Sequence, residues 1–344
     1  MRRLHLLAGA MLLLVALTTP QVRAAEDAPN HEPVEEVADS SIPVGKRGIL
    51  PLYVSADWSS PLPAITRAVV VVHGLGRNAS GYFRNARKAR AEAGEAGKGA
   101  IVIAPHFLAG VDIDAFRLPR DTLRWTFTSW EGGEPAVGPA PVSSFEALDA
   151  ILEKLADRSL FPNLKQVVLV GHSGGGQMVQ RYAIAARGDA GLVKEGVAVR
   201  YVVANPSTYV YFSRERPQPS IAASCPKFNE WKYGMEQRPA YLAGTAVAAL
   251  EQAYVARRVI YLLGTMDNDP NHSELDRTCM GEAQGPTRYA RGHTYAAMMK
   301  ARDGGTPNHV VWDVPGVAHS GGKMLTSPCG VTALFDVPGC EAAR

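Results

Sequence analysis

Seven runs of apolar residues recur along the chain, each about the length of one strand. Most are apolar throughout instead of alternating between apolar and polar positions, which is typical of parallel strands that helices cover on both faces. They therefore predict a mostly parallel central sheet. The runs span residues 49–54, 68–72, 100–104, 167–170, 197–203, 258–263 and 308–314.

Three segments between these runs carry helical patterns. Residues 80–95 are rich in Arg, Lys and Ala, and residues 177–186 contain neither Gly nor Pro. A third helix is expected from Ser143 to about Ala156, because Ser143 and Glu146 have the spacing of a capping box. Helices that alternate with buried strands indicate an α/β fold, with helices flanking the sheet.

The N-terminus has the pattern of a signal peptide. Arg2 and Arg3 precede an apolar stretch, residues 6–17, that is too short to span a membrane. Small residues near position 24 place the expected cleavage after Ala24, so residues 1–24 would be removed. We expect export to the periplasm or the extracellular space, with no stable membrane insertion afterwards. An uncleaved anchor is the alternative, and the short apolar stretch argues against it.

Removal of that segment makes the chain neutral. The full chain has 36 Lys and Arg against 33 Asp and Glu, and three of its arginines, but no acidic residue, lie in residues 1–24. With this balance we expect neither nucleic acid nor an anionic membrane as a partner. Residues 25–47 are acidic and contain proline, so we expect a flexible lead-in to a domain over residues 48–344.

Four cysteines allow two disulfides in an exported chain. Three pairings are possible. We favour Cys329–Cys340, which closes a short loop near the C-terminus, and by elimination Cys225–Cys279. Buried free thiols are the alternative.

No metal site is expected. The cysteine and histidine spacings do not match a zinc site. A calcium loop that began at Asp267 would need Gly and Glu at the positions where His272 and Thr278 stand.

Residues 167–176 combine a strand, a sharp turn and the start of a helix. The apolar run leads into Gly171-His172-Ser173-Gly174-Gly175, a Gly-x-Ser-x-Gly motif. A Cβ two residues before or after the serine would strike the strand or the helix. Ser173 is therefore expected at the carboxyl end of the strand, with a helix N-terminus behind it that favours negative charge. A Ser-Gly turn that only caps a helix is the alternative.

Three other motifs follow strands of the expected sheet. His73-Gly74-Leu75-Gly76 closes the run 68–72, and we interpret His73 as a packing residue. Asp267 follows the run 258–263, where its Gly-x-x-Asp spacing favours it over the neighbouring Asp269.

His319 lies on a glycine-rich loop after the last strand. It alone among nine histidines has this position. His272, His293 and His309 lie off the triad's place in the chain, and we expect each to tolerate replacement.

With Ser173, Asp267 and His319 in this order, the chain resembles the α/β-hydrolase superfamily from about residue 49 to 333. Exported members similar to esterases and lipases look closest. The resemblance implies a triad of these three residues, an oxyanion hole made by the N–H groups of Leu75 and Gly174, and no cofactor.

The implied reaction is cleavage of a small-molecule or polymeric carboxylic ester through an acyl-enzyme. A peptidase, an amidase or a polyester depolymerase of the same fold is an alternative. So is a non-catalytic binding module on this scaffold. The oligomeric state stays open.

Two segments between the strands could shape the site. Residues 205–254 contain prolines and many aromatic residues, and lie where this fold keeps its lid. We expect a lid that forms an apolar or aromatic acyl pocket, with a small packed extension as the alternative. The loop around Trp125 and Trp130 could line the cleft or simply pack its tryptophans.

Overall fold

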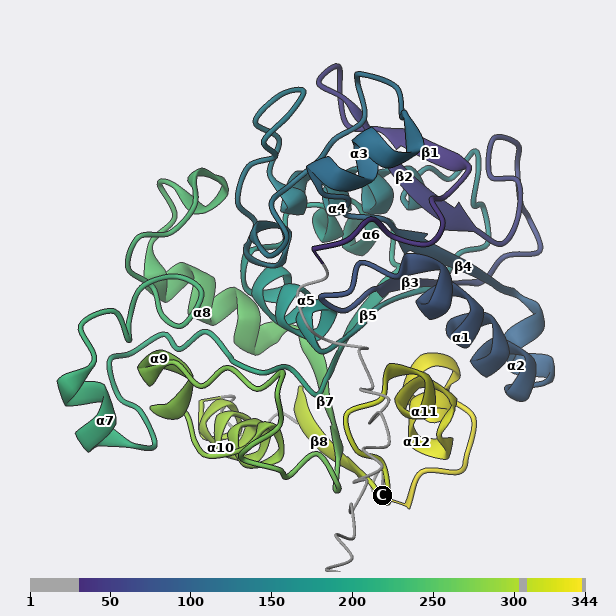
Figure 1. The fold of residues 1–344 in the computed structure, drawn as a ribbon. Coiled ribbons are helices and arrows are strands. Elements are labelled where there is room, and N and C mark those ends of the chain that lie inside the picture. Colours follow the sequence, from purple (N-terminus) through teal and green to yellow (C-terminus); the bar gives the residue numbers. More distant parts are fainter. Residues whose placement is uncertain (1–30, 303–307, 342–344) are drawn as a thin grey trace, which may run out of the picture.

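The computed structural model describes residues 31–302 and 308–341 (Figure 1). At its centre lies an eight-stranded sheet with the order β1-β2-β4-β3-β5-β6-β7-β8. β1 pairs antiparallel with β2, and β2 pairs antiparallel with β4, whereas all other neighbours are parallel. The strands are β1 (Ser40–Pro43), β2 (Ile49–Val54), β3 (Arg67–Val72), β4 (Ala100–Pro105), β5 (Gln166–His172), β6 (Ala198–Ala204), β7 (Arg258–Gly264) and β8 (His309–Val314).

All seven predicted strands are present, but the eighth, β1, falls inside the segment 25–47 that was expected to be flexible. Ile42 of β1 pairs with Leu50 of β2 and is buried, as is Val44 two residues further on. Two apolar residues at strand spacing are enough to anchor an edge strand to the sheet. Because acidic residues precede them, the sequence pattern did not predict this strand. The predicted signal peptide, residues 1–24, lies outside the described residues.

Helices cover both faces of the sheet (Figure 1). One face carries α1 (Ala79–Glu92), α2 (Glu95–Lys98), α11 (Gly321–Thr326) and α12 (Pro328–Phe335). The other carries α4 (Ser144–Leu155), α5 (Gly174–Ala185), α6 (Asp189–Lys194), α8 (Val247–Ala256) and α10 (Arg288–Lys300). Shorter helices lie in the connections: α3 (Gly110–Phe116), η1 (Ser129–Gly132), α7 (Pro219–Ser224), η2 (Ala240–Leu242) and α9 (Cys279–Glu282).

The central strands are buried on both faces, as their apolar runs predicted. In β5, Val167 and Leu169 pack into the apolar cluster on the α5 side. Val168 and Val170 pack into the cluster on the α1 side. Alternate side chains of one strand therefore hold the two helical layers to the sheet.

The predicted capping box is confirmed at the start of α4. Ser143 Oγ accepts a hydrogen bond from the N–H of Phe145 at 3.1 Å. Glu146 Oε2 accepts one from the N–H of Ser143 at 2.8 Å. These bonds satisfy backbone donors that a helix start leaves without partners.

Two long connections leave the sheet after β6 and β7. The first contains α7, and the second contains α9, which lies beside α7 at the edge of the molecule (Figure 1). A disulfide between Cys225 and Cys279 joins them, and a second links Cys329 to Cys340. Both predicted pairings are confirmed.

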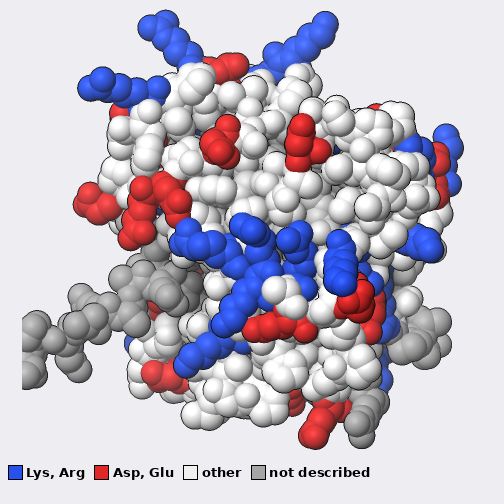
Figure 2. All heavy atoms as spheres, turned by 90° about the vertical axis from the view of Figure 1, so that its right-hand side faces the viewer, with Lys and Arg blue, Asp and Glu red and all other residues white. Residues whose placement is uncertain are grey.

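The surface carries charges of both signs. Figure 2 shows Lys and Arg side chains gathered over the face that α1 and α2 cover. Some of them are paired, since Arg84 contacts Glu36 at 2.6 Å and Lys88 contacts Glu92 at 4.0 Å. Among the described residues, no helix is long and apolar enough to cross a membrane.

The turn between β5 and α5 brings backbone segments unusually close together. A Cβ on Gly175 would lie 2.3 Å from the carbonyl oxygen of Val72 and 2.5 Å from that of His73. A Cβ on Gly171 would lie 2.1 Å from the carbonyl oxygen of Gly175. Ser173, between them, has φ +57° and ψ −123°, a region that side chains rarely adopt.

We predict that Gly175→Ala destabilises the protein by roughly 3 kcal/mol, because the new methyl group meets rigid backbone and forces α5 away from β3. Urea unfolding measures the change. Gly110→Ala is the matched control, because nothing lies within 4 Å of a Cβ at that helical position. Equal stability of both variants would contradict the close approach.

We also predict that the two disulfides contribute unequally to stability. Cys225–Cys279 spans 54 residues and Cys329–Cys340 spans 11. Loop-closure entropy then gives about 4 kcal/mol for the first and about 3 kcal/mol for the second. The double variants Cys225→Ser/Cys279→Ser and Cys329→Ser/Cys340→Ser should differ in urea unfolding in that order. The reverse order would argue against the entropic account.

Candidate active site

The structure brings Ser173, His319 and Asp267 into one hydrogen-bonded line. His319 Nε2 lies 3.0 Å from Ser173 Oγ, and His319 Nδ1 lies 2.6 Å from Asp267 Oδ2. A carboxylate only accepts, so Nδ1 carries the proton and Nε2 can accept the hydroxyl proton of Ser173. The three residues come from the ends of β5, β7 and β8, which are separated in sequence but share one edge of the sheet.

Asp267 is held in its ionised form. Burial acts to raise the pKa of this carboxyl group. The hydrogen bond from His319 and the electrostatic interactions with His319 and with the positive charge of Arg288 outweigh that effect and lower the pKa below its usual value. Arg288, at the start of α10, contacts the second carboxylate oxygen at 3.4 Å, and both side chains are almost fully buried.

The competing carboxylate does not reach His319. Asp269 is exposed, and its Oδ1 accepts a hydrogen bond from the N–H of Asn271 at 2.8 Å, which closes a local turn. The spacing argument that favoured Asp267 therefore agrees with the geometry.

Two further histidines pack against His319. The ring of His172, the residue before Ser173, lies 4.6 Å from that of His319 between centroids. The ring of His272 lies at 5.3 Å, so this residue is close to the triad in space although it lies off the triad's place in the chain. His309 is buried and bonded to Tyr261, whereas His293 faces Asp313 near the surface. Of the three histidines named as controls, His293 is therefore the one that is half-buried and contacts no triad residue.

The backbone N–H groups of Leu75 and Gly174 lie close together beside Ser173. An ideal Cβ on Gly174 would lie 3.2 Å from the nitrogen of Leu75. Within the part of the chain that the structure describes, neither N–H donates a backbone hydrogen bond. Two free donors beside a hydroxyl can bind an oxygen that carries negative charge.

His73 holds the turn that presents Leu75. Its Nδ1 donates to the carbonyl of Gly74 at 2.8 Å, and its Nε2 accepts from the N–H of Phe107 at 3.0 Å. Burial lowers the pKa of His73 to about 3, so the ring is neutral. This agrees with its interpretation as a packing residue.

A hollow of about 410 Å³ opens beside Leu75, and most of the residues that line it are polar. Lys232 Nζ lies 3.1 Å from Glu131 Oε1, and Arg181 Nη1 lies 3.6 Å from Glu131 Oε2. The charges therefore pair with one another across the wall. Trp231 and Tyr233 also line the hollow, so the aromatic part of the predicted pocket lies beside these charged groups.

Most aromatic residues of the segment 205–254 are buried and do not line the hollow. Tyr209 and Tyr211, for example, pack on Tyr295 of α10. Only Trp231 and Tyr233 reach the hollow. Composition alone could not distinguish core tyrosines from pocket tyrosines.

The loop around Trp125 and Trp130 both packs its tryptophans and lines the hollow. The two indole rings are buried against Phe107. Thr128 and Glu131, which flank Trp130, line the hollow.

Sequence reasoning missed two residues that position the site. Arg288 contacts Asp267 from 21 positions further along the chain, with no motif to mark it. Asn205 lies at the end of β6, where its Oδ1 accepts from the N–H of Gly264 at 2.9 Å and ties the ends of two strands together. An Asn directly after a predicted strand was the available signal.

In the described chain, no group of three His, Cys, Asp or Glu side chains is arranged to hold a metal ion.

Comparison with known proteins gives one family and several similar folds. A model described as the alpha/beta hydrolase family matches residues 69–322. The structure of poly(aspartic acid) hydrolase-1 from Sphingomonas sp. KT-1 is similar with a TM-score of 0.57 and 24% identity, covering 85% of this chain and 96% of that chain. A poly(3-hydroxybutyrate) depolymerase from Bordetella parapertussis gives 0.58 and 21%, with coverage of 86% and 87%. No curated protein sequence matches significantly.

The matched region extends from β3 to the start of α11 and contains Leu75, Ser173, Asp267 and His319. It covers well over half of the chain, and the parallel strand order and the turn at Ser173 agree with it. The chain therefore belongs to the alpha/beta hydrolase family.

Proposed function

We propose that the protein is a serine hydrolase that cleaves carboxylic esters through an acyl-enzyme. The observation that carries this proposal is the unbroken line from Ser173 Oγ through His319 to Asp267, at 3.0 and 2.6 Å. A binding module on the same scaffold would have no physical need for all three groups in this geometry.

In the proposed reaction, His319 accepts the proton of Ser173 Oγ as the oxygen attacks the ester carbonyl. Asp267 holds the imidazole in the required tautomer and stabilises the imidazolium that forms. The same proton then goes to the leaving alkoxide. Water, deprotonated by His319, releases the acid and regenerates Ser173. No cofactor takes part in these steps.

The N–H groups of Leu75 and Gly174 are proposed to bind the oxyanion of the tetrahedral intermediate. Each such donor contributes typically about 2.7–4 kcal/mol to transition-state stabilisation. The N-terminus of α5 adds partial positive charge at the same place. The strained backbone of Ser173 supports the proposed role of this residue as the nucleophile, because it directs Oγ away from the helix and toward His319.

The polar hollow beside Leu75 favours a substrate with polar groups near the scissile bond. Lys232 comes from the segment 205–254 and Glu131 from the loop after β4, so both segments shape the hollow. We propose that the segment 205–254 acts as the lid of this site.

The two disulfides support export. Such bonds persist in oxidising compartments, which include the periplasm and the extracellular space. The signal-like N-terminus described above is consistent with that localisation.

The decisive test of this proposal is whether Ser173 acts as the nucleophile. We predict that wild-type protein hydrolyses p-nitrophenyl esters and is labelled by a fluorophosphonate on Ser173. Ser173→Ala should lose labelling and reduce kcat by about 10⁴-fold or more, since the acyl-enzyme cannot form. Circular dichroism should show that the fold is kept.

Wild-type turnover in Ser173→Ala would remove the proposed mechanism. Matched p-nitroanilides, assayed in parallel, decide between ester and amide hydrolysis. Faster cleavage of the anilides would make the protein an amidase of the same fold.

We predict that kcat/KM rises with pH through one ionisation, that of His319. The proton acceptor must be neutral, so activity is low where the imidazole is protonated and increases as the proton leaves. Asp267, whose pKa is lowered, stays ionised over the whole rise and adds no second step. A pH–rate profile from pH 4 to 9 measures this, with roughly one log unit of activity per pH unit on the acid side.

His319→Gln should abolish the rise together with nearly all activity. His293→Gln is the matched control, because that ring contacts Asp313 at 2.8 Å and not the triad. Loss of the ionisation in His293→Gln instead would assign the base to another histidine.

A further inference from the structure

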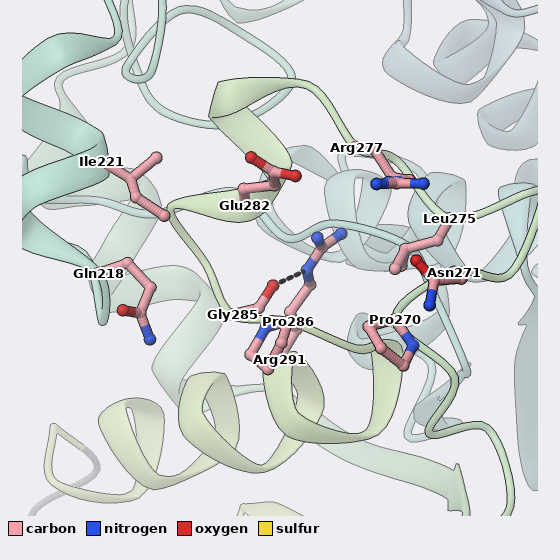
Figure 3. A pocket seen from close by; sticks show the side chains of 10 residues that line it. All are labelled: Gln218, Ile221, Pro270, Asn271, Leu275, Arg277, Glu282, Gly285, Pro286 and Arg291. Carbon is pink, nitrogen blue, oxygen red and sulfur yellow. Dashed lines mark hydrogen bonds between the residues drawn. The ribbon is translucent and has the colours of Figure 1, made fainter.

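A second pocket, of about 430 Å³, lies between the two long connections that follow β6 and β7 (Figure 3). Gln218 and Ile221 at α7 form one wall, and the loop from Pro270 to Arg277 forms the other. Arg291 rises from α10 with its guanidinium in the middle of the view, as Figure 3 shows. We call this the Arg277–Arg291 pocket.

Arg291 is fully buried and keeps one donor unused. Its Nε donates to the carbonyl of Gly285 and its Nη1 to that of Ser207, both at 2.7 Å. Its Nη2 has no hydrogen-bond acceptor in the described part of the chain. A buried cationic donor without an acceptor is unfavourable, which marks a place where a ligand oxygen would be stabilised.

The guanidinium is charged under ordinary conditions. Burial is the main cause that lowers the pKa of Arg291 to about 10, which is still well above neutrality. Its two hydrogen-bond acceptors are neutral carbonyl groups. The carboxylates of Asp276 and Glu282 act on the guanidinium electrostatically, without a hydrogen bond to it.

Two exposed side chains stand at the mouth of the pocket. Arg277 is exposed and forms no ion pair within the described residues, and Figure 3 places its guanidinium across the pocket from Gln218 and Ile221. Glu282, also exposed, is the last residue of α9. With two arginines and one glutamate, the lining carries a charge of about +1, which suits one carboxylate better than a dianion.

The Arg277–Arg291 pocket adjoins the polar hollow beside Leu75. Leu275 lines both the Arg277–Arg291 pocket and the polar hollow beside Leu75. The loop that carries Leu275 begins directly after Asp267. To reach the arginines from the hollow, a substrate would have to pass Leu275.

We infer that the Arg277–Arg291 pocket binds a carboxylate that the substrate carries away from its scissile ester bond. This inference rests on the proposed ester hydrolysis. It identifies the substrate as an acid-bearing ester, with Arg291 Nη2 at the base of the pocket and Arg277 at its mouth as the groups that recognise the acid.

The test compares charged and neutral esters of equal length. One series consists of mono-p-nitrophenyl esters of dicarboxylic acids, from succinic to suberic acid, against p-nitrophenyl esters of the matching monocarboxylic acids. A second series places the carboxylate on the alcohol, as acetyl esters of ω-hydroxy acids against acetyl esters of alkanols. The measured quantity is the ratio of kcat/KM for the charged ester to that for its neutral partner.

We expect this ratio to peak at one chain length in one of the series. Arg277→Gln should lower it about two- to fivefold, as expected for an exposed ion pair. Glu282→Gln should raise it by a similar factor, because it removes the competing negative charge. Arg120→Gln, an exposed arginine on the loop after α3, is the matched control and should leave the ratio unchanged.

Arg291→Lys should lower the ratio by about tenfold or more, because a buried charge-assisted hydrogen bond is lost. Thermal unfolding monitors whether this variant folds, since Arg291 also holds Gly285 and Ser207. The Arg277 and Glu282 variants decide the question if it does not fold.

Two results would overturn the inference while leaving ester hydrolysis intact. One is a ratio that changes no more in Arg277→Gln and Glu282→Gln than in Arg120→Gln. The other is a combination of two results: free glutarate binds to the Ser173→Ala protein in calorimetry, but neither ester series shows a preference for the charged ester. The pocket would then be a site for a free anion. Failure of the wild-type protein to cleave any ester would instead overturn the proposed function itself.

Discussion

The rest of the structure depends on how closely α5 approaches β3 and β5. Gly171 and Gly175 leave no space for a side chain between these backbones. Because the turn is so tight, Ser173 adopts its strained conformation and its N–H bonds to the carbonyl of Ala204 at the end of β6. The same closeness places the N–H of Gly174 next to that of Leu75. One packing constraint therefore fixes both the hydroxyl and the donors beside it.

The electrostatics of the site follow from the burial that this packing produces. Asp267 loses water at the end of β7, which alone would favour its neutral form. His319 and Arg288 on its two oxygens reverse that tendency, and Arg288 comes from α10. The helix that follows β7 thus does more than cover the sheet. It supplies the charge that lets a buried carboxylate remain an acceptor for the imidazole.

The fold and the line of three site residues could be predicted because both depend on local patterns. Continuous apolar runs identify strands that are buried on both faces, and glycines around Ser173 identify a turn that excludes side chains. Contacts between distant segments have no such pattern. Arg288 meets Asp267 only once α10 has packed. The tyrosines of the segment 205–254 could fill the core or line the site with the same composition, and the edge strand β1 is carried by two apolar residues in an acidic stretch.

Substrate selection is then a property of the two connections that leave the sheet after β6 and β7. The sheet edge provides Ser173, Asp267 and His319, whereas the polar hollow and the Arg277–Arg291 pocket are built largely from these connections. The Cys225–Cys279 disulfide fixes α7 to α9, so the two walls of that pocket cannot separate freely. This covalent link preserves the spacing of the charged groups in the Arg277–Arg291 pocket. A loop held only by exposed side chains would have more conformational freedom and would not keep that spacing. In this proposal, the reaction depends on the residues at the strand ends, and the specificity depends on the linked connections.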